Sequence, residues 1–321
     1  MNKFTIATDS CCDIPKPELE QNGIYCIPLS YIIDGVAHKS IFNEEKEYRG
    51  YIGLLRSGIL PGTAMLNSFD LETLFTEALE NNDGDLIFIA LSSGISGTYN
   101  NAVSVAKELT GGKFKGRNIY IVDSMSGAAG QRALVDVAIG LRDKGVEAKD
   151  AYQQLHKLAE CQQVYMLVDD LKHLKRGGRI SALSAIVGSI LNLKPLIVCN
   201  YHGHLKVHTK CRGMKKAIAT AAALAKENYR EVADFNGGLE KIVFYISHAD
   251  NDDGAKELCD AVREQIPEAE FKVYCAGPVI GTHTGPGALG LFFFGKPRLK
   301  MLPIVSKILP NRDRDKDGKH D

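Results

Sequence analysis

A group of small hydroxyl residues and glycines lies between a strand-like apolar run and a helix-like segment. The run extends over residues 86–91, the turn over 92–98 reads SSGISGT, and an amphipathic pattern begins at Gly97. A strand that enters a helix through such a turn leaves N–H groups unpaired at the helix start, and these donors favour an anion. The turn therefore predicts a cradle for a phosphate or carboxylate, with Ser93, Ser96 and the Gly97 N–H as donors. A simple helix cap is the alternative.

Polar residues also end two further strand-like runs. The run 3–8 is followed by Asp9 and Ser10, and the run 118–124 ends in Asp-Ser, whereas 24–33 reads as one continuous strand. In an open α/β sheet the carboxyl ends of the strands form the edge that carries the ligand site. If these strands are parallel, their polar ends gather there with the cradle, and Ser10 becomes a candidate ligand-binding residue. A turn followed by a helix cap explains the same residues equally well.

Three more candidates lie in predicted loops. Thr63 is a lone hydroxyl among small and apolar neighbours in the loop before a helix. Arg179 belongs to a basic stretch around a double glycine, which can line an anion site, face a partner or form a solvated turn. His283 is the only ionisable residue of the glycine-rich, apolar segment 277–295. Such a histidine is most often a core residue bound to a backbone carbonyl, but the flanking glycines and threonines favour one that faces a ligand.

Composition excludes several classes of protein. The chain has 321 residues, which is long for one hydrophobic core and favours two domains. Lysine plus arginine and aspartate plus glutamate are each 39, so no overall basic field exists to bind nucleic acid. No apolar run approaches the length of a membrane span, and the N-terminus does not resemble a signal peptide. The eight scattered cysteines contain no C-x-x-C pair, which favours reduced thiols in the cytoplasm.

The order of predicted elements favours an α/β fold with two domains. Strand-like and helix-like segments alternate through residues 1–162, which predicts a parallel, doubly wound, Rossmann-like sheet. The pattern changes in 163–296, where a hairpin over 194–211 precedes a long helix and a β-α-β unit. Residues 182–193 read as a buried apolar helix. The charged tail 297–321 is expected to be a separate, disordered segment.

Motifs for metals and nucleotides are incomplete. Residues 313–318 match only the first half of a calcium loop, and a proline follows 290–296 where a phosphate loop needs Ser or Thr. Cys199, His204 and His208 can share one face of the hairpin, but they have no standard zinc spacing. We therefore expect no metal and no cofactor apart from the bound ligand.

Four stretches together resemble one family. They read TDSCCDIP, LSSGISGTYNNA, VDDLKHLKRGGRIS and GPVIGTHTGPGALGLFFFG, and their order and distances over residues 4–295 closely resemble the DegV family. The resemblance implies a bacterial fatty-acid-binding protein that serves as the non-catalytic binding subunit of fatty acid kinase. It also implies an N-terminal Rossmann-like domain, a C-terminal α/β domain with a mixed or antiparallel sheet, and a long-chain fatty acid in a tunnel between them.

The resemblance assigns roles to the candidate residues. Thr63 and Ser96 match the family residues that hold the carboxylate, and Gly97 offers its backbone N–H. His283 matches the histidine of the GTHTGPG motif and is expected near the head group, and the turn with Arg176 and Arg179 near the same end.

The chain also departs from the family pattern near the expected head group. Ala64, Met65 and Leu66 replace residues that are usually polar or proline, and Ala128 and Ala129 replace a typical Ser-Met pair.

Three functional hypotheses remain at this point. The first is a lipid-binding protein that presents the carboxylate to an ATP-dependent, dihydroxyacetone-kinase-like subunit, which forms the acyl phosphate. Burial of an acyl chain of about sixteen carbons supplies on the order of 10 kcal/mol, and neutral donors then leave the carboxylate accessible. The alternatives are a serine-dependent acyl hydrolase that uses Ser96 and His283, and a sensor whose protein contacts respond to bound lipid.

Overall fold

The computed structural model describes residues 3–169, 171–180, 193–231, 239 and 241–298. The predicted apolar helix at 182–193 lies outside this part of the chain except for its last residue, which opens a strand. The calcium-like stretch 313–318 and all but the first two residues of the predicted tail lie outside it as well.

The N-terminal half forms a four-stranded parallel sheet in the order β2-β1-β6-β7. Its central strands are apolar and buried on both faces, as parallel sheets require. Along β6, Leu86 and Phe88 pack on one side of the sheet, and Ile87 and Ile89 pack on the other. The predicted parallel sheet is confirmed, with these strands: β1 (Phe4–Asp9), β2 (Ile24–Ile27), β6 (Asp85–Ala90) and β7 (Ile119–Asp123).

Six helices and one short 3-10 turn belong to the same half. The helices are α1 (Lys16–Gln21), α2 (Glu45–Arg56), α3 (Ser68–Glu80), α4 (Thr98–Gly111), α5 (Ala128–Asp143) and α6 (Ala148–Cys161), and the turn is η1 (Ser10–Cys12).

A small antiparallel sheet departs from the sequence prediction. The run 24–33 does not form one strand, because it divides at Pro28, and its second part, β3 (Ser30–Ile33), leaves the parallel sheet. A proline lacks the N–H that a strand interior needs, which explains the break. β3 pairs with β4 (Val36–Lys39) and with β5 (Gly62–Ala64), so the predicted loop around Thr63 contains an edge strand.

The C-terminal half forms a six-stranded mixed sheet, in the order β10-β9-β8-β13-β11-β12, in which only β11 and β12 are parallel neighbours. This confirms the predicted mixed sheet, hairpin and β-α-β unit. The strands are β8 (Gln162–Leu167), β9 (Leu193–Cys199), β10 (Leu205–Arg212), β11 (Val243–His248), β12 (Glu270–Cys275) and β13 (Leu289–Phe294). The helices are α7 (Lys172–Arg176), α8 (Met214–Asn228), α9 (Asp252–Gln265) and α10 (Pro278–Thr284).

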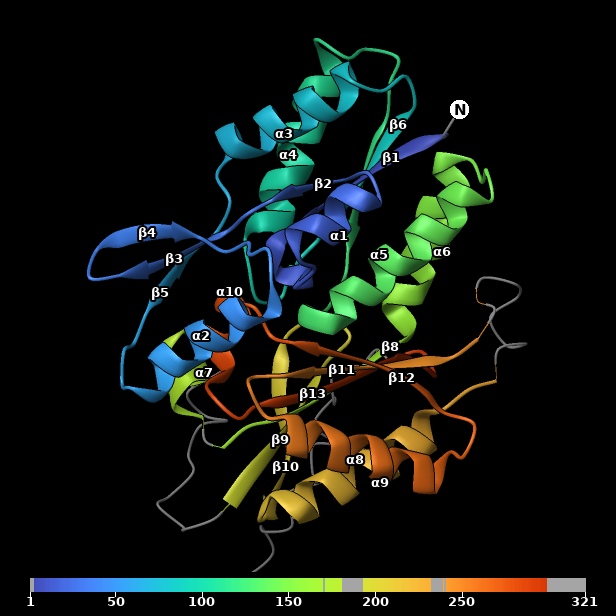
Figure 1. Ribbon diagram of the computed structural model, residues 1–321. Coiled ribbons are helices and arrows are strands. Elements are labelled where there is room, and N and C mark those ends of the chain that lie inside the picture. The colour runs from blue at the N-terminus through green and yellow to red at the C-terminus, as the bar shows by residue number, and fades with distance from the viewer. Residues whose placement is uncertain (1–2, 170, 181–192, 232–238, 240, 299–321) are drawn as a thin grey trace, which may run out of the picture.

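Helices and sheets stack in alternating layers (Figure 1). α3 and α4 cover the outer face of the parallel sheet, and α8 and α9 cover the outer face of the mixed sheet. α5 and α6 lie between the two sheets, and α5 packs against strands of both. The inner layer therefore joins the two halves and provides the wall along which a shared site can form.

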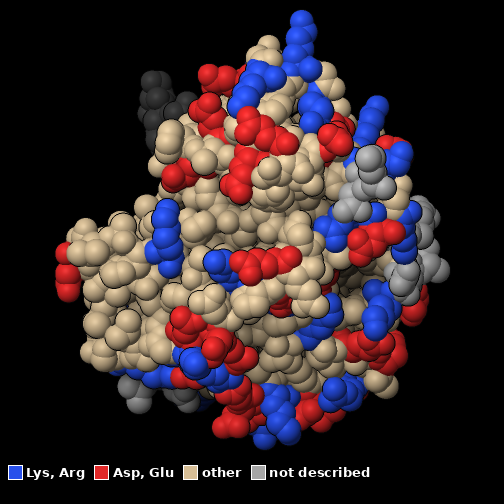
Figure 2. Space-filling model, turned by 45° about the horizontal axis from the view of Figure 1, so that its top comes forward, with Lys and Arg blue, Asp and Glu red and all other residues tan. Residues whose placement is uncertain are grey.

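Charges are well mixed on the surface. In Figure 2 acidic and basic side chains are interspersed at the top, right and bottom of the visible face, whereas its left part shows few charged side chains. None of the helices described has both the length and the apolar character that crossing a bilayer demands.

Candidate functional site

Carboxylates organise the ends of the parallel strands. Asp9 at the end of β1 accepts a hydrogen bond from the Leu91 N–H at 2.7 Å, and so ties β1 to the turn after β6. Asp123 at the end of β7 accepts from the Ser93 N–H at 3.1 Å and from the Met125 N–H at 2.9 Å. The polar strand ends thus gather at one edge, as the sequence predicts, and they hold the serine-rich turn in place.

A pocket lies beside this edge, between the two sheets. Its empty space amounts to about 810 Å³ when the open solvent at its mouth is included. Residues from both halves of the chain line it, and most are apolar. The lining residues are Leu29, Thr63, Ala64, Met65, Leu91, Ser92, Ile95, Ser96, Ser126, Gly127, Ala128, Val164, Met166, Leu174, Arg179, Cys199, Gly203, Leu205, Val279, Ile280, His283, Thr284 and Phe292.

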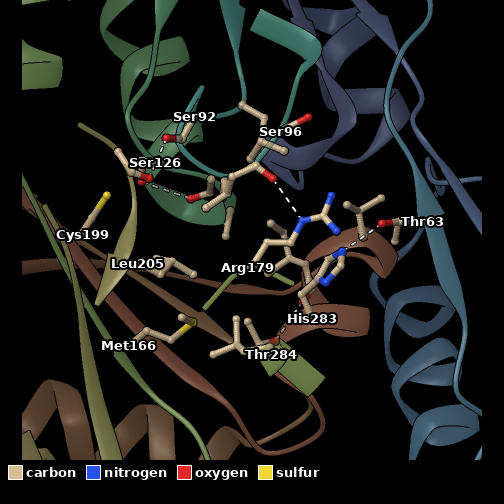
Figure 3. A pocket seen from close by; sticks show the side chains of 18 of the residues that line it. Thr63, Ser92, Ser96, Ser126, Met166, Arg179, Cys199, Leu205, His283 and Thr284 are labelled. Carbon is tan, nitrogen blue, oxygen red and sulfur yellow. Dashed lines mark hydrogen bonds between the residues drawn. The ribbon is translucent and has the colours of Figure 1, made fainter. Parts of the chain in front are cut away.

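Four of the predicted ligand-binding residues line this pocket together: Thr63, Ser96, Arg179 and His283. Thr63 and His283 are 220 positions apart in the sequence, yet Thr63 Oγ1 lies 2.9 Å from His283 Nε2. In Figure 3 Arg179 and His283 lie between Ser96 and Thr63, and this polar group faces Ser126, Cys199 and Met166 across the pocket. The pocket therefore has one polar end.

Ser96 precedes the N-cap residue of α4, which is Gly97. Its hydroxyl accepts from the Thr98 N–H at 3.2 Å and donates to Thr98 Oγ1 at 3.0 Å, while the N-cap position itself has no side-chain hydrogen bond. The Ser96 side chain also lines the pocket. The Gly97 N–H has no acceptor within the described part of the chain and lies on a shallow depression that adjoins the pocket mouth. Donors at the start of a fourteen-residue helix favour an anion at this point.

Arg179 adds positive charge at the polar end. Its Nε donates to the Ile95 carbonyl at 3.1 Å, which fixes the guanidinium beside the turn, and its Nη1 donates to the Gly177 carbonyl. Within the described residues no carboxylate forms an ion pair with Arg179. An anionic ligand can therefore supply the counter charge.

His283 is neutral at physiological pH. Burial, and to a smaller extent the charges of Arg179, Arg176 and His173, lower its pKa to about 4. The same positive potential stabilises a ligand carboxylate in its ionised form. His283 Nδ1 is buried and has no hydrogen-bond partner among the described groups. With the proton on Nε2, Nε2 donates to Thr63 Oγ1 and the threonine hydroxyl is free to donate to a ligand.

The double glycine of the basic stretch has a packing role. A Cβ atom on Gly177 would lie 2.1 Å from His283 Nδ1, and Gly178 adopts a φ of +70°. The imidazole therefore packs directly against the backbone after α7, which brings Arg179 to the same end of the pocket.

Three predicted residues lie outside the lining of the pocket: Gly97, on the adjoining depression, and the two serines Ser10 and Ser93. Ser10 is buried, and its hydroxyl accepts from the Leu29 N–H at 3.0 Å. Ser93 donates to Asp123 Oδ2 at 2.5 Å. Both hydroxyls are engaged by protein groups, so a ligand-binding role for them stays a prediction.

The sequence analysis did not single out the residues that close the pocket on the far side. Ser92 donates to the Gly203 carbonyl at 2.9 Å, and His204 Nδ1 lies 2.7 Å from the Gly94 carbonyl. The tip of the β9–β10 hairpin is thereby attached to the serine-rich turn, and Leu205 behind the tip lines the pocket. The hairpin predicted over 194–211 implied a turn at its tip, but no local sequence pattern indicates which distant turn that tip contacts.

The departures from the family pattern fall partly on the pocket wall. Ala64, Met65 and Ala128 line the pocket, whereas Leu66 and Ala129 belong to the buried core. Ala128 adopts a left-handed φ of +51°, which costs on the order of 1 kcal/mol in a non-glycine residue.

The cysteine and histidines of the hairpin do not assemble a metal site: no group of three or more possible metal ligands exists among the described residues.

Comparison with known proteins decides the family. A model of the DegV family, described as "Uncharacterised protein, DegV family", matches residues 3–296. The chain belongs to the DegV family. A DegV domain-containing protein of Clostridium perfringens is 34% identical over 295 residues, covering 92% of this chain and 98% of the relative. Another, of Caldanaerobacter subterraneus, is 34% identical over 293 residues, covering 91% of this chain and 99% of the relative.

Solved structures of the DegV family share the fold. DegV of Bacillus subtilis, described as a fatty acid binding protein, matches with a TM-score of 0.76 at 30% identity, covering 92% of this chain and 100% of the neighbour. A DegV family protein of Thermus thermophilus, solved for its fatty acid binding, matches with a TM-score of 0.75 at 26% identity and the same coverage. The two-domain α/β fold expected from the family resemblance is confirmed.

Proposed function

We propose that this DegV-family chain binds a long-chain fatty acid in the pocket between its two sheets. The observation that carries the proposal is the polar end of the pocket, where Thr63, Ser96, Arg179 and His283 line one end of a mostly apolar cavity. The fatty acid binding described for the relatives from Bacillus subtilis and Thermus thermophilus supports the same class of ligand.

In this proposal the carboxylate lies among the donors of the polar end. The Thr63 hydroxyl donates to one carboxylate oxygen, because the His283 Nε2–H already occupies the threonine oxygen as acceptor. The Gly97 N–H donates from the start of α4, and the Ser96 hydroxyl donates as well when it exchanges its bond to Thr98 Oγ1 for one to the ligand. Arg179 supplies the counter charge. Hydrogen bonds to an ionised group are the stronger class, so this end fixes the ligand's orientation.

The acyl chain extends along the apolar wall that both sheets provide. Each methylene removed from water contributes about 0.8 kcal/mol, so the chain supplies most of the affinity and the polar end supplies the direction.

We further propose that the protein itself is not an enzyme and presents the carboxylate to an ATP-dependent kinase subunit for acyl phosphate formation. The Ser96 hydroxyl is hydrogen-bonded to Thr98, and His283 is bonded to Thr63, so this arrangement does not activate Ser96 as a nucleophile. The depression at Gly97 and Arg179 adjoins the pocket mouth, which leaves the head group accessible to a partner. All eight cysteines are free thiols, which supports a reducing compartment such as the cytoplasm.

Mass spectrometry of lipid extracted from the purified protein tests the ligand. We expect a fatty acid of palmitate or oleate size, and delipidated protein should gain thermal stability when palmitate is added. Recovery of no fatty acid together with no thermal shift would contradict the proposal.

The partner and the alternatives are tested separately. A pull-down with loaded protein should capture an ATP-binding kinase subunit, and addition of ATP should yield acyl phosphate. Capture of a different protein only in the loaded state would favour a lipid-responsive sensor. Turnover of an activated acyl ester that Ser96→Ala abolishes would favour the hydrolase.

A further inference from the structure

A second, smaller cavity adjoins the pocket. It lies between the mixed sheet, at β8, β11 and β13, and the helices α5 and α10. Its empty space amounts to about 250 Å³ when open space at its edge is included, and Ser247, Ala249, Ala276 and Ala288 belong to its wall but not to the wall of the pocket. Five residues line both spaces: Ala128, Met166, Ile280, Thr284 and Phe292. These shared residues therefore lie between the cavity and the pocket.

Phe292 is the largest of the shared side chains, and its ring is held in a defined place. A Cβ atom on Gly130 of α5 would lie 2.6 Å from Phe292 Cδ1, and one on Gly290 of β13 would lie 2.6 Å from Phe292 Cε2. The ring therefore occupies a slot that exists because both neighbours are glycines. Phe292 itself is 5% exposed, so the slot is deep in the molecule.

The slot lies away from the polar end. A Cβ atom on Gly130 would also lie 2.2 Å from Ser126 Oγ, so the ring of Phe292 is on the Ser126 side of the pocket. Figure 3 shows Ser126 and Met166 across the pocket from Thr63. A fatty acid whose carboxylate binds at Thr63 and Ser96 thus directs its methyl end toward Phe292.

We propose that the Phe292 ring is the stop that sets the maximum length of the acyl chain, and that its removal joins the second cavity to the pocket. This inference rests on the proposed function, because it concerns which fatty acids the same site accepts. Each further methylene that finds apolar space improves the Kd about fourfold, whereas one that meets the ring must displace it or bend. The alanines of the second cavity leave that space empty in the wild-type protein.

The test measures Kd values for saturated fatty acids from fourteen to twenty carbons with the delipidated full-length protein. We expect the wild-type affinity to rise with chain length and then fall, and Phe292→Ala to move the optimum upward by two carbons or more. Phe292→Leu removes less volume and should move it less; this variant also carries the test if the alanine variant does not fold.

Two matched variants separate this role from a loss of packing. Phe294→Ala removes a buried ring two residues further along the same face of β13, and Phe294 lines neither cavity, so the optimum should stay at the wild-type length. Ala288→Val narrows the second cavity only, and it should cancel the gain when combined with Phe292→Ala.

The outcomes distinguish the two proposals. A wild-type protein that binds no fatty acid of any length overturns the proposed function itself. A wild-type protein that binds fatty acid, with a length optimum unchanged in both Phe292 variants, overturns the chain-length stop alone. An equal shift in Phe294→Ala would also overturn it, because the effect would then come from general loosening of the core.

Discussion

Two groups of hydroxyl residues lie at the same edge of the parallel sheet, and they differ in what occupies their hydrogen bonds. In the inner group, the Ser93 hydroxyl is bonded to Asp123, and Ser10 accepts from the Leu29 backbone. In the outer group, Thr63 and Ser96 line the pocket beside an arginine that forms no ion pair with any described residue. The residue types are alike, so the difference comes from the partners that the fold brings to each.

This comparison distinguishes polar side chains that stabilise the fold from polar side chains that are placed to bind a ligand. The inner group is satisfied within the protein, and buried polar groups of this kind hold strand ends together. Beside the outer group, the Gly97 N–H has no acceptor and Arg179 has no ion pair among the described residues, and a site that binds an anion needs such groups before the ligand arrives. Stability should therefore depend mainly on the inner group, and ligand affinity mainly on the outer group.

The largest effect is expected for Asp123→Ala. The carboxylate accepts from the N–H and hydroxyl of Ser93 and from the Met125 N–H, and its loss leaves these donors unpaired. We expect the free energy of unfolding to fall by about 3 kcal/mol in urea denaturation of the unliganded protein. The exposed ion-pair residue Asp143 provides a control, since Asp143→Ala should change stability by less than about 0.5 kcal/mol. Equal stability of the two variants would show that the inner group does not hold the turn.

Replacement of the outer hydroxyls should act on the ligand. Thr63→Val keeps the side chain's shape but removes the donor, so we expect about tenfold weaker binding of palmitate. Thr284→Val is a matched control, because Thr284 lines the same pocket but donates to the Ile280 carbonyl within its helix at 3.0 Å. Isothermal titration should show less than a twofold change for the control. Equal losses of palmitate affinity in the two variants would contradict the placement of the carboxylate at the polar end.

The sequence predicts the strands and the sheet edge that carry both groups better than it predicts the hydrogen-bond partner of each hydroxyl. The alternation of strand-like and helix-like segments indicated the parallel strands, and the polar strand ends indicated the edge beside which the pocket lies. Spacing alone could not distinguish Ser93 from Ser96, because the partner of Ser93 is Asp123, which arrives from another strand. The contact between Thr63 and His283 spans 220 positions, so it followed from the family resemblance and not from a local pattern.

Other features depend on contacts that no local pattern shows. Pro28 was visible in the run 24–33, yet the strand beyond it also needed β4 and β5 as partners before a separate sheet could form. The hairpin tip at Gly203 was predicted as a turn, but its attachment to Ser92 depends on how the two sheets meet. Packing between distant elements decides these features, and the hydrophobic periodicity within one element does not indicate which distant elements pack together.

Ser93→Ala sharpens the comparison with a smaller effect. The variant loses one hydrogen bond to a carboxylate that keeps two others, so we expect about 1 kcal/mol of destabilisation in urea. The affinity for palmitate should remain within twofold of wild type. Ser104→Ala on the exposed face of α4 serves as control and should leave both quantities unchanged. A tenfold loss of affinity with unchanged stability would move Ser93 into the outer group.

The last prediction concerns the pH dependence of stability. It depends on His283, which contacts Thr63 of the outer group. Its pKa falls from 6.5 in the unfolded chain to about 4 in the folded protein, so between these values the unfolded state binds the extra proton. The contribution of the neutral imidazole to the free energy of unfolding is fully present above pH 6.5 and is lost as the pH falls toward 4. About 1 kcal/mol of it is lost by pH 5.5.

Urea denaturation of the unliganded protein between pH 7.5 and 5.5 measures this contribution as a difference between variants. His283→Gln keeps a donor toward Thr63 but does not titrate, so its stability should fall less than that of wild type over this range. The exposed His202 of the hairpin tip is a matched control, and His202→Gln should follow the wild-type curve. Parallel curves for wild type and His283→Gln would mean that the imidazole is hydrated in the free protein. The donors of the outer group would then be engaged by water before the ligand arrives, and the contrast with the inner group would be weaker.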